Sequence, residues 1–226
     1  MAESKTLLIL RLEGPLQSWG ENSKWDHRDS ADLPTKSGII GLLGCALGLP
    51  RKDPALVELC SAVRLAVRAD RPGIRTTDYQ TVTGTPLLNA EGKPKTTGNT
   101  IVSPREYLQD ACFTVFLETD PGWREKIRAA LLSPRWCLYL GRKSCVPSRP
   151  VLAEESDAYA SLEDAANRYP AADRAIEPMI CEFEREDPAL SSYLRPDRLA
   201  APGRSFALRR VWRGVRKEDT DVPEQN

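Results

Sequence analysis

The sequence contains very few of the residues from which metal centres and catalytic sites are most often built. Its 226 residues include one histidine, His27, and six cysteines, none of them in a C-x-x-C pair. This scarcity argues against a zinc site and against a dense disulfide framework. Adjacent carboxylates such as Glu154 and Glu155 belong to a strongly acidic segment, where solvated charge is a better interpretation than metal ligation. We therefore expect neither a metal nor a cofactor.

Long hydrophobic runs are also missing. The most apolar stretch, residues 34–48, is interrupted by glycines and is too short to span a membrane. The first residues do not have the layout of a signal peptide. Because 41% of the residues are hydrophobic, the chain can still bury a substantial core. We expect a cytoplasmic protein without membrane contact.

The formal net charge is zero, but the charges are unevenly distributed along the chain. Residues 126–153 contain no acid, and a second acid-free window, 198–217, is rich in arginine; residues 154–187 between them hold eleven acids and three arginines. This pattern favours one face for a polyanion such as nucleic acid and another for protein neighbours. A mixed, solvated surface is the alternative.

Glycines recur at positions 38, 41, 44 and 48 of the apolar stretch. In a helix, Gly41, Gly44 and Gly48 fall on one face, where each costs about 0.5–1 kcal/mol relative to alanine. Such a bare face is typical of a docking surface. Thr35 or Ser37 can cap the helix, and Lys36 with the first N–H groups suits an anion. The preceding loop lacks the glycine of a Walker A motif, which argues against nucleoside triphosphate binding.

The hydrophobic pattern predicts an α+β fold. Helices are expected at 34–48, 53–60 and 121–132, and strands at 5–13, 63–67, 111–118 and 135–141. The resulting order, strand, helix, strand, strand, helix, strand, is that of a ferredoxin-like βαββαβ body over residues 1–150, as in RNA-recognition domains.

Two further segments surround this body. The link 70–110 is too long for a structureless loop, so we expect an inserted hairpin with 78–83 opposite 99–103. Residues 151–226 are expected to form a small C-terminal β extension, with strands at 179–184 and 205–212.

Four segments in matching order and spacing resemble CRISPR-associated protein 5 of subtype I-E. They are Leu12–Gly20, Pro34–Gly38 with its Gly-Leu-Leu-Gly continuation, Arg105–Leu108 and Tyr139–Cys145. The resemblance covers residues 5–150 well. It implies that residues 70–110 are a thumb gripping the repeat-derived 5′ handle of CRISPR RNA in Cascade, a surveillance complex. The implied neighbours are the backbone subunit and the large subunit, and target DNA is met only through the complex, because guide pairing reads it.

The candidate RNA-binding residues are loop residues, cations and exposed rings in these segments. They are Gln17, Ser18, Trp19 and Arg28; Lys36 and Ser37; Arg75, Tyr79, Lys93, Lys95 and Arg105; and Tyr139, Arg142, Lys143, Ser144 and Arg149. Aromatic rings can stack on bases, and cations can neutralise phosphates. The turn with Arg142 and Lys143 is the favoured phosphate contact, because no carboxylate nearby in the sequence competes for it. The alternatives are core packing for Trp19 and Tyr139, and an ordinary surface role for Lys36.

We therefore predict a non-catalytic RNA-binding subunit that acts in antiviral defence. The first alternative is a metal-independent endoribonuclease that processes precursor CRISPR RNA with His27, together with a lysine or tyrosine, as general base and acid. The resemblance points away from it, since subtype I-E leaves processing to a separate subunit. The second alternative is a scaffold whose basic segments contact acidic proteins.

Overall fold

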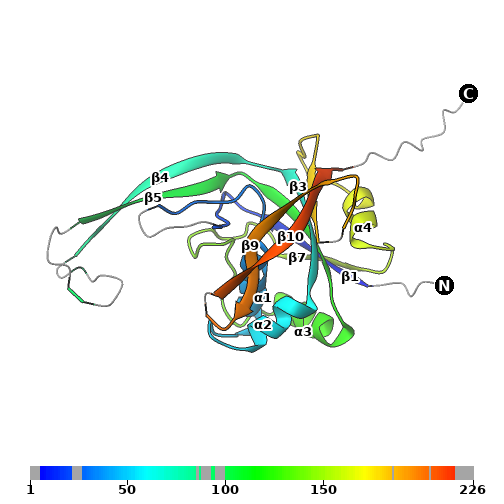
Figure 1. The fold of residues 1–226 in the computed structure, drawn as a ribbon, viewed down its shortest axis with the longest axis horizontal. Coiled ribbons are helices and arrows are strands. Elements are labelled where there is room, and N and C mark those ends of the chain that lie inside the picture. Colours follow the sequence, from blue (N-terminus) through cyan, green and yellow to red (C-terminus); the bar gives the residue numbers. More distant parts are fainter. Residues whose placement is uncertain are drawn as a thin grey trace, which may run out of the picture.

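The computed structural model describes residues 6–21, 27–84, 87, 93–94, 100–184, 186–203 and 205–216. Over these residues the chain forms an α+β fold of four helices and two antiparallel sheets (Figure 1). The predicted fold class is confirmed at this level.

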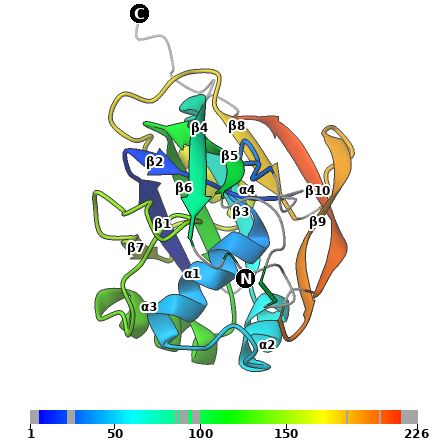
Figure 2. The same ribbon diagram turned by 90° about the vertical axis from the view of Figure 1, so that its left-hand side faces the viewer.

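The larger sheet has seven strands and is covered by helices on both faces. Its order is β7 (Leu152–Ser156), β1 (Leu7–Glu13), β6 (Cys112–Glu118), β3 (Arg64–Arg71), β8 (Ile180–Phe183), β10 (Ser205–Val215) and β9 (Ser191–Ala201). One face packs against α1 (Lys36–Leu47), α2 (Ala55–Ala62) and α3 (Pro121–Leu132), and the other against α4 (Leu162–Arg168) (Figures 1 and 2).

Strand β1 shows why the first apolar run is nearly continuous. Leu8, Leu10 and Leu12 point into the core beneath α1, whereas Leu7 and Ile9 point into the core beneath α4. Because alternate side chains face opposite sides of a strand, a strand buried on both faces needs apolar residues at every position. The expected strand at 5–13 is confirmed.

The inserted hairpin is also present. β4 (Ile74–Thr83) pairs with β5 (Thr100–Gln109), and β2 (Leu16–Gln17) adds a short third strand at its base. Gln80 lies opposite Ser103, which confirms the expected pairing, although the hairpin is longer than predicted at its base. It projects well away from the body (Figure 1). Lys95 and Asn99 lie outside the described residues.

The strand expected at 135–141 is wrong, because this segment is an irregular loop. Its backbone groups bond elsewhere: Arg135 N donates to Ala46 O at the end of α1 (2.8 Å), and Leu140 O accepts from Ser18 N (3.2 Å). The edge of β1 that the segment was expected to occupy is paired with β7 instead. The apolar and aromatic residues of this segment predicted an extended backbone, but they could not predict which backbone groups it would hydrogen-bond to.

The C-terminal extension belongs to the same sheet. The expected strands at 179–184 and 205–212 are confirmed as β8 and β10, and β9 was missed. Strand β9 contains Pro196, which argues against a central strand; it is tolerated because β9 lies at the sheet edge, beside an irregularity in its pairing with β10.

Candidate nucleic-acid interface

The start of α1 does not offer a free anion site. Thr35 caps the helix, and its Oγ1 accepts from Gly38 N at 3.1 Å. Lys36 N donates to the Asp197 carboxylate (2.8 Å), and the buried Lys36 Nζ donates to Val63 O (2.8 Å) and to Glu184 (3.0 Å). The expectation that Lys36 and the first N–H groups meet an external anion is therefore wrong, because carboxylates of the chain already bind both.

Carboxylates of the chain also bind two arginines of the second basic window. Arg209 pairs with Asp197 (2.6 Å) and Glu184 (3.2 Å), and Arg213 pairs with Glu182 (3.3 Å). Burial by itself raises the pKa of Asp197, but the Arg209 hydrogen bond and charge outweigh burial and hold that pKa below its usual value. Part of the acidic segment, Glu182 and Glu184, is therefore paired with part of the second basic window within the fold, so the two segments are not fully separated onto two faces.

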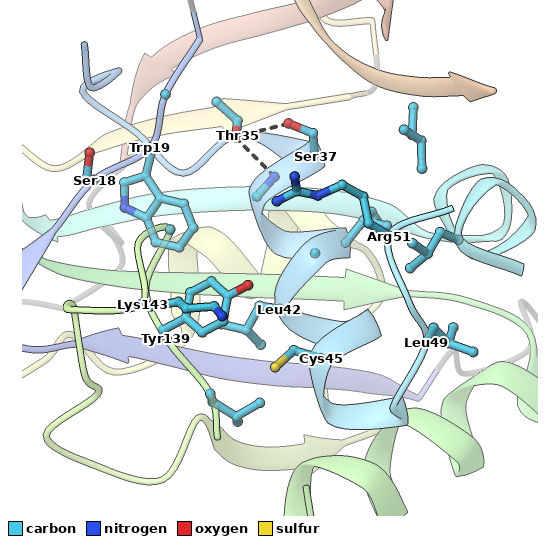
Figure 3. Close-up of a pocket in the computed structure, with 18 of the residues that line it drawn as sticks. Ser18, Trp19, Thr35, Ser37, Leu42, Cys45, Leu49, Arg51, Tyr139 and Lys143 are labelled. Atoms are coloured by element: carbon cyan, nitrogen blue, oxygen red, sulfur yellow. Dashed lines mark hydrogen bonds between the residues drawn. The ribbon is translucent and has the colours of Figure 1, made fainter. Parts of the chain in front are cut away.

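A large pocket lies between α1, the loop 133–146 and the turn between β9 and β10. Its volume is about 1040 Å³ (Figure 3). Four of its lining residues are aromatic: Trp19, Trp136, Tyr139 and Phe206. In Figure 3, Arg51 extends across the face of α1, and Tyr139 and Lys143 approach from the loop opposite.

The glycines of α1 shape one wall of this pocket. A Cβ at Gly38 would lie 2.8 Å from the Trp19 ring, and a Cβ at Gly44 would lie 2.4 Å from Leu56. At the exposed Gly41 a Cβ would meet nothing within 4 Å. Gly38 and Gly44 therefore make room for side chains of the same chain, whereas Gly41 opens into the pocket.

The loop 133–146 is held in place by close backbone packing. Gly141 has φ 86° and sits so near β2 that a Cβ would lie 1.7 Å from Ser18 O, so only glycine fits. Next to it, the Arg142 guanidinium stacks 4.6 Å from the centre of the Tyr107 ring and donates to Arg28 O (3.0 Å). Its buried Nη1 has no hydrogen-bond partner among the residues that the structure describes.

Two cations of the pocket carry no counter-charge. Among the described residues, none forms an ion pair or hydrogen bond with Arg51 or Lys143, and the pocket lining contains no Asp or Glu. Ser144, next to Lys143, is exposed, and Ser37 is half-buried at the pocket wall. An acid-free rim over aromatic and apolar walls suits a ligand that is both anionic and planar.

Three predicted contacts are instead built into the protein interior. Gln17 is fully buried, and its Nε2 donates to Leu12 O and Ala111 O, both at 2.9 Å, while its Oε1 accepts from Trp19 Nε1 (3.1 Å). Ser18 Oγ donates to Glu106 O (2.9 Å). Trp19 is 1% exposed, although its ring edges the pocket. Gln17 thus has a structural role, and Trp19 packs in the core, which was the alternative considered for it.

Two predicted cations on the surface are bound by carboxylates. Arg75 on β4 donates to Asp32 and Glu106, and Arg149 pairs with Glu13 (3.3 Å) and Asp173 (3.6 Å). For Arg149 the expected freedom from competing carboxylates is therefore wrong.

Glu106 links this cluster to the single histidine. Burial raises the pKa of Glu106, but the bonds from Ser30 N–H, Arg75 and His27 outweigh it, so the net pKa is lowered. His27 Nε2 lies 3.0 Å from Glu106 Oε1. The histidine is half-exposed and already has a carboxylate partner.

The remaining predicted residues lie on or beside the hairpin. Tyr79 is 68% exposed, Lys93 is exposed, and Arg105 on β5 donates from Nε to Ser103 Oγ (3.4 Å). Arg28 pairs with Arg105 through an isolated backbone bridge. The structure therefore brings Arg28, Arg105 and Arg142 together at the base of the hairpin.

Sequence reasoning missed three pocket residues: Arg51, Trp136 and Phe206. Trp136 lies in the first acid-free window, so its proximity to Lys143 was a usable signal that the expected strand obscured. Phe206 comes from the C-terminal extension, and only tertiary structure places it beside α1.

No cluster of histidine, cysteine, aspartate or glutamate suited to a metal occurs within the described ranges. Likewise, no helix in that part of the chain is long and apolar enough to cross a membrane.

Known proteins similar to this chain point to one family. Residues 7–212 match the family described as CRISPR-associated protein (Cas_Cas5). The chain is 37% identical over 161 residues to the "CRISPR system Cascade subunit CasD" of Escherichia coli K12, covering 65% of this chain and 70% of that protein.

Two solved structures extend the similarity to nearly the full length. One, described as "CRISPR RNA-guided surveillance complex", has a TM-score of 0.77 and 30% identity, covering 94% of this chain and 90% of the other. A second, "Crystal structure of Cas protein", has a TM-score of 0.72 and 36% identity, covering 94% and 95%. The match over residues 7–212 confirms the resemblance noted in the sequence, and the chain belongs to the CRISPR-associated protein 5 family.

Proposed function

We propose that this chain is a non-catalytic RNA-binding subunit of a CRISPR surveillance complex of the Cascade type, where it holds the 5′ handle of the guide RNA. The names of its relatives, a Cascade subunit and an RNA-guided surveillance complex, support this assignment. The observation that carries it is the acid-free pocket beside α1, which combines Arg51 and Lys143 with aromatic walls.

We infer a ferredoxin-like body for this subunit. In chain order, the four strands of this body are β1, β3, β6 and β7. In the sheet, β7 lies beside β1, and β6 lies between β1 and β3, as the βαββαβ arrangement requires. Its last strand is β7, so the body extends to residue 156 instead of 150.

The β4–β5 hairpin, inserted between β3 and β6, is then the thumb. Figure 2 is seen from the side to which the hairpin extends, and α1 lies at the front of this view, below the hairpin base. Thumb and pocket therefore share one side of the molecule, where a single strand of RNA can contact both. The backbone and large subunits of the complex would adjoin this body, and target DNA would be reached only through guide pairing.

Copurification tests this function. From cells that express a CRISPR array, we expect the full chain to copurify with intact CRISPR RNA. Lys143→Glu should reduce the yield of that RNA, because it places a carboxylate among the phosphates. Lys126→Glu on α3 is the matched control, since this exposed lysine lies outside the pocket lining. Recovery of no CRISPR RNA with the wild-type chain would contradict the proposal.

The ribonuclease alternative depends on His27. Its bond to Glu106 orients the ring, but acid and base catalysis needs a second group, and Arg75 already binds the same carboxylate. Specific cleavage of precursor CRISPR RNA in EDTA by the wild-type chain, lost in His27→Ala, would favour the enzyme over the binding subunit.

A further inference from the structure

The pocket beside α1 is large enough to admit part of a nucleic-acid strand. At about 1040 Å³ it reaches the upper end of the range for small-molecule sites, about 300–1,000 Å³. It therefore has room for a nucleoside together with the phosphate that follows it.

The side chains that line the pocket suit a nucleoside with its phosphate. Trp136 is 46% exposed and Tyr139 half-buried, so both rings present surface to an occupant. Apolar walls, from residues such as Leu42 and Leu49, lie beneath an acid-free rim that carries Arg51 and Lys143. A purely apolar protein segment would leave both cations without partners, whereas a base with its phosphate satisfies the rings and the charges together.

The helix wall supplies a flat surface for the base. At Gly41 no side chain covers α1, and a Cβ there would meet no atom within 4 Å. A planar ring can approach the helix backbone closely at this point. Beside it, Ser37 Oγ bonds weakly to Thr35 Oγ1 (3.4 Å) and can turn to a base edge.

We propose that this pocket binds one unstacked nucleobase of the guide RNA, with the adjacent phosphates against Lys143 and Arg51. The inference rests on the proposed RNA-binding function and names the part of the RNA that the pocket takes. Because every base has a π-face, the pocket alone selects an extruded base more than a particular sequence.

Replacing Gly41 tests the pocket directly. Gly41→Leu projects a side chain into the open space, since a Cβ at this position meets no protein atom within 4 Å; Ala129→Leu, at an exposed position of α3 outside the pocket lining, is the matched control. The probe is a single-stranded repeat-derived RNA in which 2-aminopurine replaces one position at a time, titrated with the full chain.

The expected result is specific to one position of the RNA. With wild type and Ala129→Leu, the fluorescence of 2-aminopurine at one position should change strongly on binding; with Gly41→Leu that change should be lost. Affinity should fall about 5- to 150-fold in Gly41→Leu, the equivalent of one lost stacking contact. An abasic residue at that position should weaken wild-type binding equally and leave Gly41→Leu unaffected.

Cys137 provides an independent readout, because this exposed cysteine lines the same pocket. Its alkylation by iodoacetamide should slow when intact RNA is bound, and should remain fast with the abasic RNA.

The outcomes separate this inference from the function on which it rests. If wild type binds the RNA but no position responds, and Gly41→Leu binds equally well, the base pocket is wrong while RNA binding stands. The pocket is equally wrong if Gly41→Leu binds RNA normally but no longer assembles with neighbouring subunits, because the occupant is then protein. If wild type does not bind the RNA, both proposals fail.

Discussion

The glycines of α1 have different consequences, because their neighbours differ. Gly38 lies under the Trp19 ring and beside the capping Thr35, whereas Gly41 faces open space. The sequence pattern could identify the glycines but could not say which of these positions another side chain already covers. At Gly38 the covering side chain is the indole of Trp19, which follows β2.

A pair of substitutions measures this difference. Gly41→Ala should raise the free energy of unfolding by about 0.5–1 kcal/mol, because alanine favours the helix at no steric cost. Gly38→Ala should lower it by about 1–3 kcal/mol, because the new Cβ collides with Trp19 at 2.8 Å. Chemical denaturation checks both values. Equal shifts in the same direction would contradict the packing described for Trp19.

The cysteines should differ sharply in reactivity. Burial raises the pKa of Cys112 to about 11 and that of Cys181 to about 12, and it also raises the pKa values of Cys45, Cys60 and Cys145. A thiol that stays protonated is a poor nucleophile. Iodoacetamide at pH 8 should therefore modify the exposed Cys137 first, as mass spectrometry of peptides can show. Modification of Cys181 at a comparable rate in folded protein would contradict this order.

Among the secondary-structure elements, the sequence predicted those with strong local signals. β1 has a run buried on both faces, and an Asp-Pro pair stands at the start of both α2 and α3: Asp53 Oδ1 accepts from Ala55 N (2.9 Å) and Asp120 Oδ1 from Trp123 N (3.0 Å). The errors, the strand at 135–141 and the missed β9, depend on which sheet edge is free. Sheet edges are a property of tertiary structure, which local patterns do not encode.

For the candidate site, too, the sequence predicted some features and missed others. The sequence predicted that the glycine-rich helix and the turn with Lys143 belong to the candidate site, and both line the pocket. The burial of Gln17 and Lys36 could not be predicted, because their partners, Ala111 and Glu184, lie far away in the chain.

The attachment of α1 to the C-terminal strands depends on a buried carboxylate. Asp197 on β9 accepts from Lys36 N and pairs with Arg209 on β10. Asp197→Asn should lower the free energy of unfolding at pH 7 by about 3–5 kcal/mol, because it leaves a buried guanidinium without this counter-charge. Chemical denaturation of both proteins measures the difference.

The pH dependence of the free energy of unfolding tests whether the charge of Asp197 stabilises the fold. The pKa of Asp197 is lowered in the folded protein, so its stabilisation is complete above the unfolded value of about 3.9 and is lost as pH falls through the folded pKa. The difference between wild type and Asp197→Asn should therefore shrink as the pH falls below about 4. A difference that stays constant down to about pH 2 would show that the charge of Asp197 is not responsible.

Over the entire chain, zero net charge conceals an uneven surface. The acidic segment neutralises Arg209 and Arg213 internally, while Arg128 and Arg149 have carboxylate partners on the surface. Of the first acid-free window, Lys143 lines the pocket beside α1 together with Arg51, whereas the exposed Lys126 lies on α3 outside the pocket lining. RNA binding should therefore depend on few cations in one place.

The salt dependence of RNA affinity tests this account most directly. Repeat-derived single-stranded RNA is titrated with the wild-type chain, Lys143→Ala and Lys126→Ala at several salt concentrations. For Lys143→Ala, the slope of log affinity against log salt concentration should be shallower by about 0.7, the value of one lost phosphate contact on a single strand. Lys126→Ala should keep the wild-type slope and affinity. Identical slopes and affinities for all three proteins would contradict the placement of the RNA at the pocket beside α1.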